Sequence, residues 1–261
     1  EIGVLLKALD DFKGRWTLQT SVALRLAPYV MLRPAEICEA EWEELNLDTA
    51  EWYIPAARMK MSRDHIVPLP RQAVELFLEI RPFSGGNKYV FPSPRKHNAP
   101  ISTASLLQAI RRIGYASTKE EGNSFCTHGF RGMASTTLNQ HPNFQHLKHD
   151  WIEFQLAHAQ ADKVRAAYNI LTPRSYIIER RKMVQEYANY LDRLKAAAAG
   201  QQTGRNEAGS FSDGMNINVI VGKLPAQAQV REKDTGWSEA QREQMRNQGY
   251  DGIDMVNAWY S

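Results

Sequence analysis

The segment on which the fold assignment depends reads Thr127-His128-Gly129-Phe130-Arg131. Threonine is a common helix N-cap, so we predict a helix that starts at Thr127 and runs through Asn139. Residues three apart share one face of a helix, so His128 and Arg131 should point the same way near its N-terminus. Histidine supplies acid–base chemistry near neutral pH, and arginine supplies a fixed positive charge. A surface pair without a role would give the same pattern.

A second segment with a possible phosphate site reads Leu32-Arg33-Pro34-Ala35-Glu36. Proline suits the first turn of a helix, so we predict that one helix ends near Met31 and another begins at Pro34. The free N–H groups of a helix N-terminus and the planar fork of Arg33 can bind phosphate oxygens together. Simple pairing of Arg33 with Glu36 at the surface is the alternative explanation.

Between these two segments the pattern is typical of short strands. We predict strands over residues 51–55, 58–60 and 65–69, with a turn at 61–64 and a small antiparallel sheet as the result. Lys60 would then lie at the tip of a hairpin, from which a lysine can reach into a cleft as a proton donor. Most hairpin lysines only keep the edge of a sheet soluble.

A fourth segment combines Leu156-Ala157-His158 with Arg165-Ala166-Ala167-Tyr168 on two short predicted helices, residues 149–157 and 162–169. A tyrosine hydroxyl is a poor nucleophile because its pKa is about 10, so it needs a base and dense positive charge around its target. A tyrosine flanked by alanines more often packs in a core. Tyr176 is a rival nucleophile, but no histidine stands ten residues before it.

Apolar periodicity predicts further helices over residues 2–9, 18–31, 71–80, 102–113 and 175–199, with a loop at 82–87. After Gly200 the composition changes to Gln, Gly, Ser and Asn, which is typical of a linker. We therefore predict an α+β, mainly α domain over residues 1–199 and a C-terminal extension of unknown role over 200–261. The chain starts at Glu1 within a helical pattern, so we expect a piece of a longer protein.

The composition of the 261 residues sets broad limits on function. Residues 1–200 carry 26 basic and 21 acidic side chains, whereas residues 201–261 carry 6 basic and 8 acidic ones. The predicted domain therefore has a net positive charge and the extension a net negative one. Cys38 and Cys126 match no metal or redox spacing and suggest a reducing, intracellular setting. We expect no metal site: His141, His146 and His149 cluster without a carboxylate or cysteine pattern. No apolar run is long enough to span a bilayer, so we expect no membrane partner.

The order of the candidate residues is more informative than any one of them. Arg33, Lys60, the His128–Arg131 pair, His158 and Tyr168 follow one another at intervals of 27, 68, 27 and 10 residues. In these motifs the chain resembles the catalytic domain of tyrosine recombinases, and most of all the integrases of prophages and genomic islands. The resemblance covers about residues 1–195. It implies a helical catalytic domain with a small antiparallel sheet.

The resemblance implies a role for each matching residue. Arg33 and Arg131 hold the non-bridging oxygens of the scissile phosphate with help from His158, and Glu36 orients the site. Lys60 protonates the leaving 5′-oxygen, and His128 exchanges a proton near the nucleophile. Tyr168 forms a 3′-phosphotyrosyl link, and a 5′-hydroxyl from a partner strand reverses the reaction. No cofactor is implied.

The implied partners are double-stranded DNA attachment sites, bound by a tetramer of the full-length protein in the bacterial cytoplasm, at the nucleoid. The candidate backbone contacts are Arg63, Arg95, Lys96, Arg111 and Arg112, although each could be an ordinary solvated charge. Three alternatives stay open: an idle DNA-binding module of the same fold, a type IB topoisomerase-like enzyme, and an all-α interaction domain that matches by accident.

Overall fold

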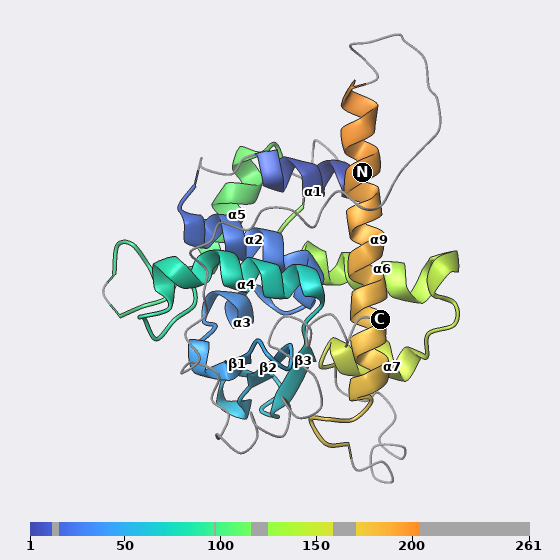
Figure 1. Cartoon of the computed structure of the whole chain (residues 1–261), viewed down its shortest axis with the longest axis horizontal. Helices are drawn as coiled ribbons and strands as arrows, with labels where there is room; N and C mark the ends of the chain where they lie inside the picture. The colour runs from blue at the N-terminus through green and yellow to red at the C-terminus, as the bar shows by residue number, and fades with distance from the viewer. Residues whose placement is uncertain (12–15, 97, 116–124, 159–170, 204–261) are drawn as a thin grey trace, which may run out of the picture.

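The computed structural model describes residues 1–11, 16–96, 98–115, 125–158 and 171–203. Within these ranges the chain is mainly helical with one small antiparallel sheet, which confirms the predicted fold class (Figure 1). Tyr168, the predicted helix over 162–169 and nearly all of the predicted extension lie outside the described residues. None of the described helices is long and apolar enough to cross a membrane.

Helix α2, Leu18–Val30, is the central helix of the fold, and most of its side chains are buried. Thr17 caps its N-terminus by accepting a hydrogen bond from the backbone N–H of Thr20. Its end at Met31, in left-handed backbone, confirms the predicted boundary. Because α2 packs against helices on several sides, its apolar residues form the middle of the core.

Helices α1, Ile2–Asp11, and α9, Ile177–Thr203, come from opposite ends of the described chain and pack side by side (Figure 1). Gly3 permits their close approach, since a Cβ atom there would lie 2.1 Å from the carbonyl oxygen of Leu194. On α9 the predicted apolar face is buried at Val184, Tyr187 and Leu191. The helix continues past Gly200, beyond its predicted end.

The sheet has the order β1-β2-β3, with β1 Leu45–Asn46, β2 Glu51–Ile54 and β3 His65–Pro68, all antiparallel. In its register Trp52 pairs with Val67, and Ile54 pairs with His65. Two of the predicted strands, residues 51–55 and 65–69, are therefore confirmed as a hairpin. The short strand β1 carries no strong sequence pattern and was not predicted.

The predicted strand over residues 58–60 is wrong, because Ala56–Arg58 forms a 3-10 turn, η2. The carboxylate of Asp64 accepts a hydrogen bond from the N–H of Ala56 at 2.8 Å and stabilises the start of this turn. The guanidinium of Arg58 binds Glu44, with Nε–Oε1 and Nη2–Oε2 distances of 2.7 and 2.6 Å. Lys60 consequently lies in the β2–β3 loop, not at the end of a strand.

Helix α4, Arg71–Ser84, covers the core beside α2 and runs through Pro82, so the predicted loop at 82–87 starts too early. Tertiary contacts hold the last turn: the indole N–H of Trp42 donates to the carbonyl of Ser84 at 2.9 Å. The Ser84 hydroxyl donates to the carbonyl of Val90 at 2.7 Å. Such contacts override the helix-breaking tendency of a proline near a helix end.

The remaining helices carry or adjoin the predicted site. They are α3 Pro34–Cys38, η1 Trp42–Glu44, α5 Thr103–Arg112, α6 Gly129–Gln140, η3 Pro142–Phe144 and α7 His149–Gln155. Ser102 caps α5 as predicted. The predicted N-cap at Thr127 is wrong, because His128 occupies the N-cap position of α6 and Thr127 is a buried turn residue.

Candidate active site

The centre of the candidate site is the guanidinium of Arg131, which is buried with 4% of its surface exposed. Nη1 donates a hydrogen bond to the carbonyl of Met31 at 3.0 Å, and Nη2 donates to the carbonyl of Leu156. Met31 ends α2 and Leu156 follows α7, so one side chain of α6 joins three segments that lie far apart in the sequence.

Arg33 lies beside this centre, at the N-cap of the five-residue helix α3. Its Nη1 donates to one oxygen of Glu36 at 2.8 Å, and its backbone N–H donates to the other oxygen at the same distance. Side-chain exposure is 18% for Arg33 and 3% for Glu36, so the pair is not the surface ion pair of the alternative explanation. Glu36 fixes the direction of the guanidinium and closes the first turn of α3.

The positive charges of Arg33 and Arg131 act on each other. The pKa of Arg131 is lowered to about 10, first by burial and then by repulsion from Arg33, against the attraction of Glu36 and Glu153. Arg131 therefore stays charged near neutral pH, in surroundings that favour the approach of an anion. A buried charge interacts more strongly than an exposed one because water screens it less.

Left-handed backbone occurs beside both carbonyls that bind Arg131. Met31 has a φ of 59°, and Ala157, which follows the second acceptor, has a φ of 46°. For residues other than glycine this conformation costs about 1–2 kcal/mol, so the surrounding contacts must stabilise it. Arg131 supplies two such contacts and thereby holds the turns that lead to Arg33 and to His158.

The other predicted residues that the structure describes are more open to solvent than Arg131 and Arg33. His158 is 39% exposed, and its Nδ1 lies 2.8 Å from a carboxylate oxygen of Glu153. His128 is exposed at the start of α6, one turn before Arg131. Lys60 is exposed in the β2–β3 loop, and the described contacts do not connect it to either arginine. The place of Tyr168 lies outside the described residues.

The sequence reasoning missed His65, which is 4% exposed on strand β3. Its Nε2 lies 3.3 Å from the carbonyl of Gln155, the residue before Leu156. Burial and the charge of Arg180 lower the pKa of His65 to about 3, so the ring is neutral and Nε2 acts as donor to that carbonyl. The sequence feature that could have indicated a role for His65 is a histidine within an otherwise apolar strand.

Three of the five predicted DNA contacts share one groove. Arg95, Lys96 and Arg112 line a cavity of about 450 Å³ together with Trp16 and the residues that cap α2 and α5. All three side chains are exposed. Arg63 and Arg111 are exposed elsewhere, in the β2–β3 loop and near the end of α5.

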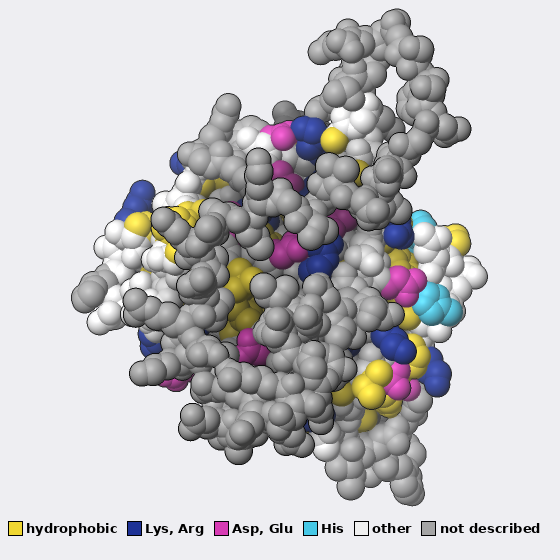
Figure 2. All heavy atoms as spheres, viewed as in Figure 1, with side chains coloured by type: hydrophobic (Ala, Val, Ile, Leu, Met, Phe, Trp, Pro, Cys, Tyr) yellow, Lys and Arg dark blue, Asp and Glu magenta, His cyan; other side chains and the backbone are white. Residues whose placement is uncertain are grey.

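The histidines of the α6–α7 region each contact a different neighbour. His141 and His146 lie outside α-helices, whereas His149 is the first residue of α7, so an interpretation of all three as loop residues is wrong for His149. Nδ1 of His141 accepts the N–H of Asn143, His146 lies 3.0 Å from a carboxylate oxygen of Glu186, and His149 contacts Asn139. Histidine side chains are visible at the right-hand edge of Figure 2. Within the described ranges no three His, Cys, Asp or Glu side chains could hold a metal ion together.

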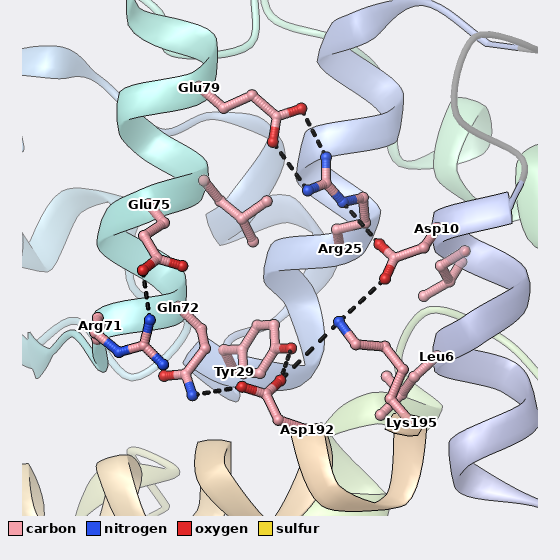
Figure 3. A pocket seen from close by; sticks show the side chains of 12 residues that line it. Leu6, Asp10, Arg25, Tyr29, Arg71, Gln72, Glu75, Glu79, Asp192 and Lys195 are labelled. Atoms are coloured by element: carbon pink, nitrogen blue, oxygen red, sulfur yellow. Dashed lines mark hydrogen bonds and ion pairs between the residues drawn. The ribbon is translucent and has the colours of Figure 1, made fainter. Parts of the chain in front are cut away.

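A pocket of about 360 Å³ between α1, α2, α4 and α9 is lined by side chains of both charges (Figure 3). Arg25 joins Asp10 to Glu79, and the hydroxyl of Tyr29 donates to Asp192 at 2.8 Å. None of the predicted site residues lines this pocket. Its ion pairs connect the helices that surround α2, so we interpret it as part of the scaffold.

Comparison with known proteins assigns the family. Residues 1–173 match the model of the phage integrase family. Prophage integrase IntA of Escherichia coli K12 is 41% identical over 168 residues, which are 64% of this chain and 37% of IntA. Prophage integrase IntZ of the same strain is 38% identical over 75% of this chain and 44% of IntZ. The integrase of Enterobacteria phage P4 is 35% identical over 72% of this chain and 43% of the relative.

The chain belongs to the phage integrase family, because the family model covers well over half of it. It spans less than half the length of these curated relatives. A crystal structure of XerA recombinase aligns with 69% of this chain and 62% of its own, with a TM-score of 0.46 and 17% identity.

The neutral state of His65 gives a prediction on stability. Below pH 6.5 the unfolded chain binds a proton at His65 that the folded chain accepts only near pH 3. The free energy of unfolding should therefore fall as the pH decreases from 6.5, by up to about 1.4 kcal/mol per pH unit from this residue. His65→Gln keeps a donor nitrogen and does not titrate, so its stability should depend less on pH.

Urea unfolding at a series of pH values from 7 to 4.5 measures this difference. His149→Gln, which changes an exposed histidine, is the matched control and should follow the wild-type profile. Parallel profiles of His65→Gln and the wild type would show that His65 is not held neutral.

Proposed function

We propose that this chain contains the catalytic centre of a site-specific DNA recombinase, an integrase that cleaves and rejoins duplex DNA through a 3′-phosphotyrosyl link to Tyr168. The observation that carries the proposal is the buried Arg131 guanidinium, which holds the segments of Arg33 and His158 next to each other in a chain of the phage integrase family.

The proposed biological task is integration or excision of a mobile genetic element. Relatives named prophage integrase and phage integrase support this task. The substrate would be a pair of double-stranded attachment sites in the bacterial cytoplasm, at the nucleoid, and four copies of the full-length protein would assemble on them. Strand exchange needs one active site per strand, and two duplexes have four strands.

The two arginines are proposed to bind the scissile phosphate. Phosphoryl transfer places negative charge on the equatorial oxygens, and preorganised donors that neutralise it lower the barrier. A guanidinium has five N–H donors, of which Arg131 uses two on the carbonyls described above. Glu36 orients the fork of Arg33. His158 adds a hydrogen bond, and its partner Glu153 fixes the ring.

The proposed cleavage step balances in atoms and charge. The Tyr168 oxygen forms a bond to phosphorus as its proton passes to His128, and the bond from phosphorus to the 5′-oxygen breaks. Lys60 gives the 5′-oxygen a proton, so the leaving group departs as a neutral hydroxyl. The new phosphodiester to tyrosine conserves the energy of the broken one. A 5′-hydroxyl from the partner strand then attacks phosphorus and releases Tyr168.

The groove of Arg95, Lys96 and Arg112 is proposed to hold the DNA backbone outside the active site. Exposed cations that share one concave surface can follow successive phosphates, and N–H groups of two capped helix starts lie beside them. Arg63 and Arg111 would contact the backbone at other places. Binding through phosphates alone should weaken steeply with salt.

A test with a nicked attachment-site duplex separates this proposal from its alternatives. The nick lets the short 5′-hydroxyl strand diffuse away, so a covalent intermediate accumulates and survives denaturation. We expect an adduct with the wild-type chain and none with Tyr168→Phe, which lacks the nucleophilic oxygen. Mass spectrometry of the digested adduct should place the DNA on Tyr168.

Tyr176→Phe is the matched control because the Tyr176 ring packs edge-on against Phe154, with centroids 6.0 Å apart. It should form the adduct as the wild type does. An adduct that persists in Tyr168→Phe contradicts the assignment, and no adduct with the wild-type chain favours an idle DNA-binding module. An adduct with relaxation of supercoiled DNA but no strand transfer between two sites favours a topoisomerase.

The leaving-group role of Lys60 gives a separate prediction. Lys60→Ala should slow adduct formation by about 100-fold or more, the usual range for losing a general acid, with little change in DNA affinity. A duplex with sulfur in place of the bridging 5′-oxygen should restore the rate, because a thiolate leaves without a proton. Gel-based kinetics with both duplexes measure this, with Met61→Ala, which changes an exposed side chain next to Lys60, as the control. Equal losses on both duplexes would contradict the role of Lys60 as acid.

A further inference from the structure

Gln155, the last residue of α7, joins the candidate site to two other parts of the fold. Its surface is fully buried. Its backbone carbonyl contacts Nε2 of His65 on β3 at 3.3 Å. Its side-chain oxygen accepts two hydrogen bonds from Arg180 on α9, from Nε at 3.0 Å and from Nη2 at 2.8 Å. The carbonyl of the next residue, Leu156, is the one that binds Arg131.

Arg180 completes the connection between α7, α9 and β3. It is fully buried, and Nη2 also donates to the carbonyl of Ile66 at 2.6 Å. Its guanidinium carbon lies 4.8 Å from the ring centre of Phe154, so the charge rests on an aromatic face. Burial lowers the pKa of Arg180 to about 9. The turn at residues 156–158 is therefore fixed from both sides, by Arg131 and by this network.

Stability alone does not explain such a network. Among the residues that the structure describes, the amide nitrogen of Gln155 and Nη1 of Arg180 are buried without a hydrogen-bond partner. Each unsatisfied donor costs about 1–3 kcal/mol, and well-packed apolar residues in place of buried charged groups often stabilise a protein. The directional hydrogen bonds of this network fix the position of the α7 end, which apolar packing would leave less defined.

We propose that Gln155 and Arg180 are positioning residues, which hold the Leu156 carbonyl and His158 in the geometry that Arg131 needs to bind the scissile phosphate. The inference rests on the proposed function. Neither residue touches the substrate. Both act through the turn that follows α7, whose backbone is left-handed at Ala157.

Two variants of Gln155 separate position from packing. Gln155→Leu keeps a similar volume and removes the acceptor oxygen. Gln155→Glu keeps the acceptor for Arg180 and replaces only the amide nitrogen, which has no partner among the described residues. It also places a carboxylate against the buried guanidinium. Gln155→Glu should therefore keep the geometry, whereas Gln155→Leu should not.

The first measurement is the rate of adduct formation in a single turnover, with DNA affinity measured in parallel. Misplacement of catalytic groups by about 1 Å slows reactions by about 100-fold, so we expect a loss of about 10- to 100-fold in Gln155→Leu. Its dissociation constant for DNA should change by less than about twofold, because phosphate contacts on the groove remain. Gln155→Glu should form the adduct at a rate within about threefold of the wild type, because its remaining acceptor oxygen keeps the turn in place.

The second measurement is hydrogen exchange of the peptide that covers residues 153–158, in the full 261-residue chain without DNA. Exchange there should accelerate in Gln155→Leu and stay at the wild-type level in Gln155→Glu. The same exchange in both variants and the wild type contradicts the positioning role. An equally slow adduct rate in both variants contradicts it as well.

These outcomes separate the inference from the proposed function. A wild-type chain that forms no adduct contradicts the function of the chain, and hydrogen exchange still decides whether Gln155 fixes the turn. A wild-type chain that forms an adduct at a rate unchanged in Gln155→Leu contradicts the inference alone. Where Gln155→Leu does not fold, Gln155→Glu decides: a folded Glu variant that has lost the rate or the protection of residues 153–158 overturns the proposal.

Discussion

The arrangement of the candidate site depends on the burial of one guanidinium. Arg131 donates to the carbonyls that end α2 and α7, and these carbonyls stand just before the segments of Arg33 and His158. Without Arg131 both carbonyls would lose a charged donor, and the left-handed turns at Met31 and Ala157 would lose a stabilising contact. The residue proposed to bind phosphate therefore also holds together the segments that form its own site.

Around this fixed centre the proposed catalytic residues divide by exposure. Arg131 and Glu36 are buried and Arg33 nearly so, whereas Lys60, His128 and His158 are open to solvent. The buried side chains can hold their charges in a preorganised arrangement before DNA binds. The three exposed side chains can reach a bound duplex without any change in the core. In the proposed mechanism, phosphate recognition therefore belongs to buried side chains and proton transfer to exposed ones.

Local patterns predicted much of the fold, and long-range contacts explain most of what they did not. The α2 boundary at Met31 and the Ser102 cap follow from periodicity and capping. The failures at Pro82 and at residues 58–60 come from tertiary partners, Trp42 and Glu44, that no local pattern reveals. The meeting of Arg33 with Arg131 was predictable only from the order of the motifs. The support from Gln155 and Arg180 was not, because a buried polar contact leaves no periodic signal.

The central claim is that Arg33 and Arg131 serve one phosphate. A crystal structure of the chain on a nicked duplex, with vanadate at the nick in place of the transferring phosphate, tests it most directly. The account predicts that both guanidinium groups lie within hydrogen-bond distance of the same vanadate and that the Tyr168 oxygen occupies an apical position of it. Guanidinium groups on different phosphates, or a Tyr168 hydroxyl directed away from the vanadate, would contradict the account.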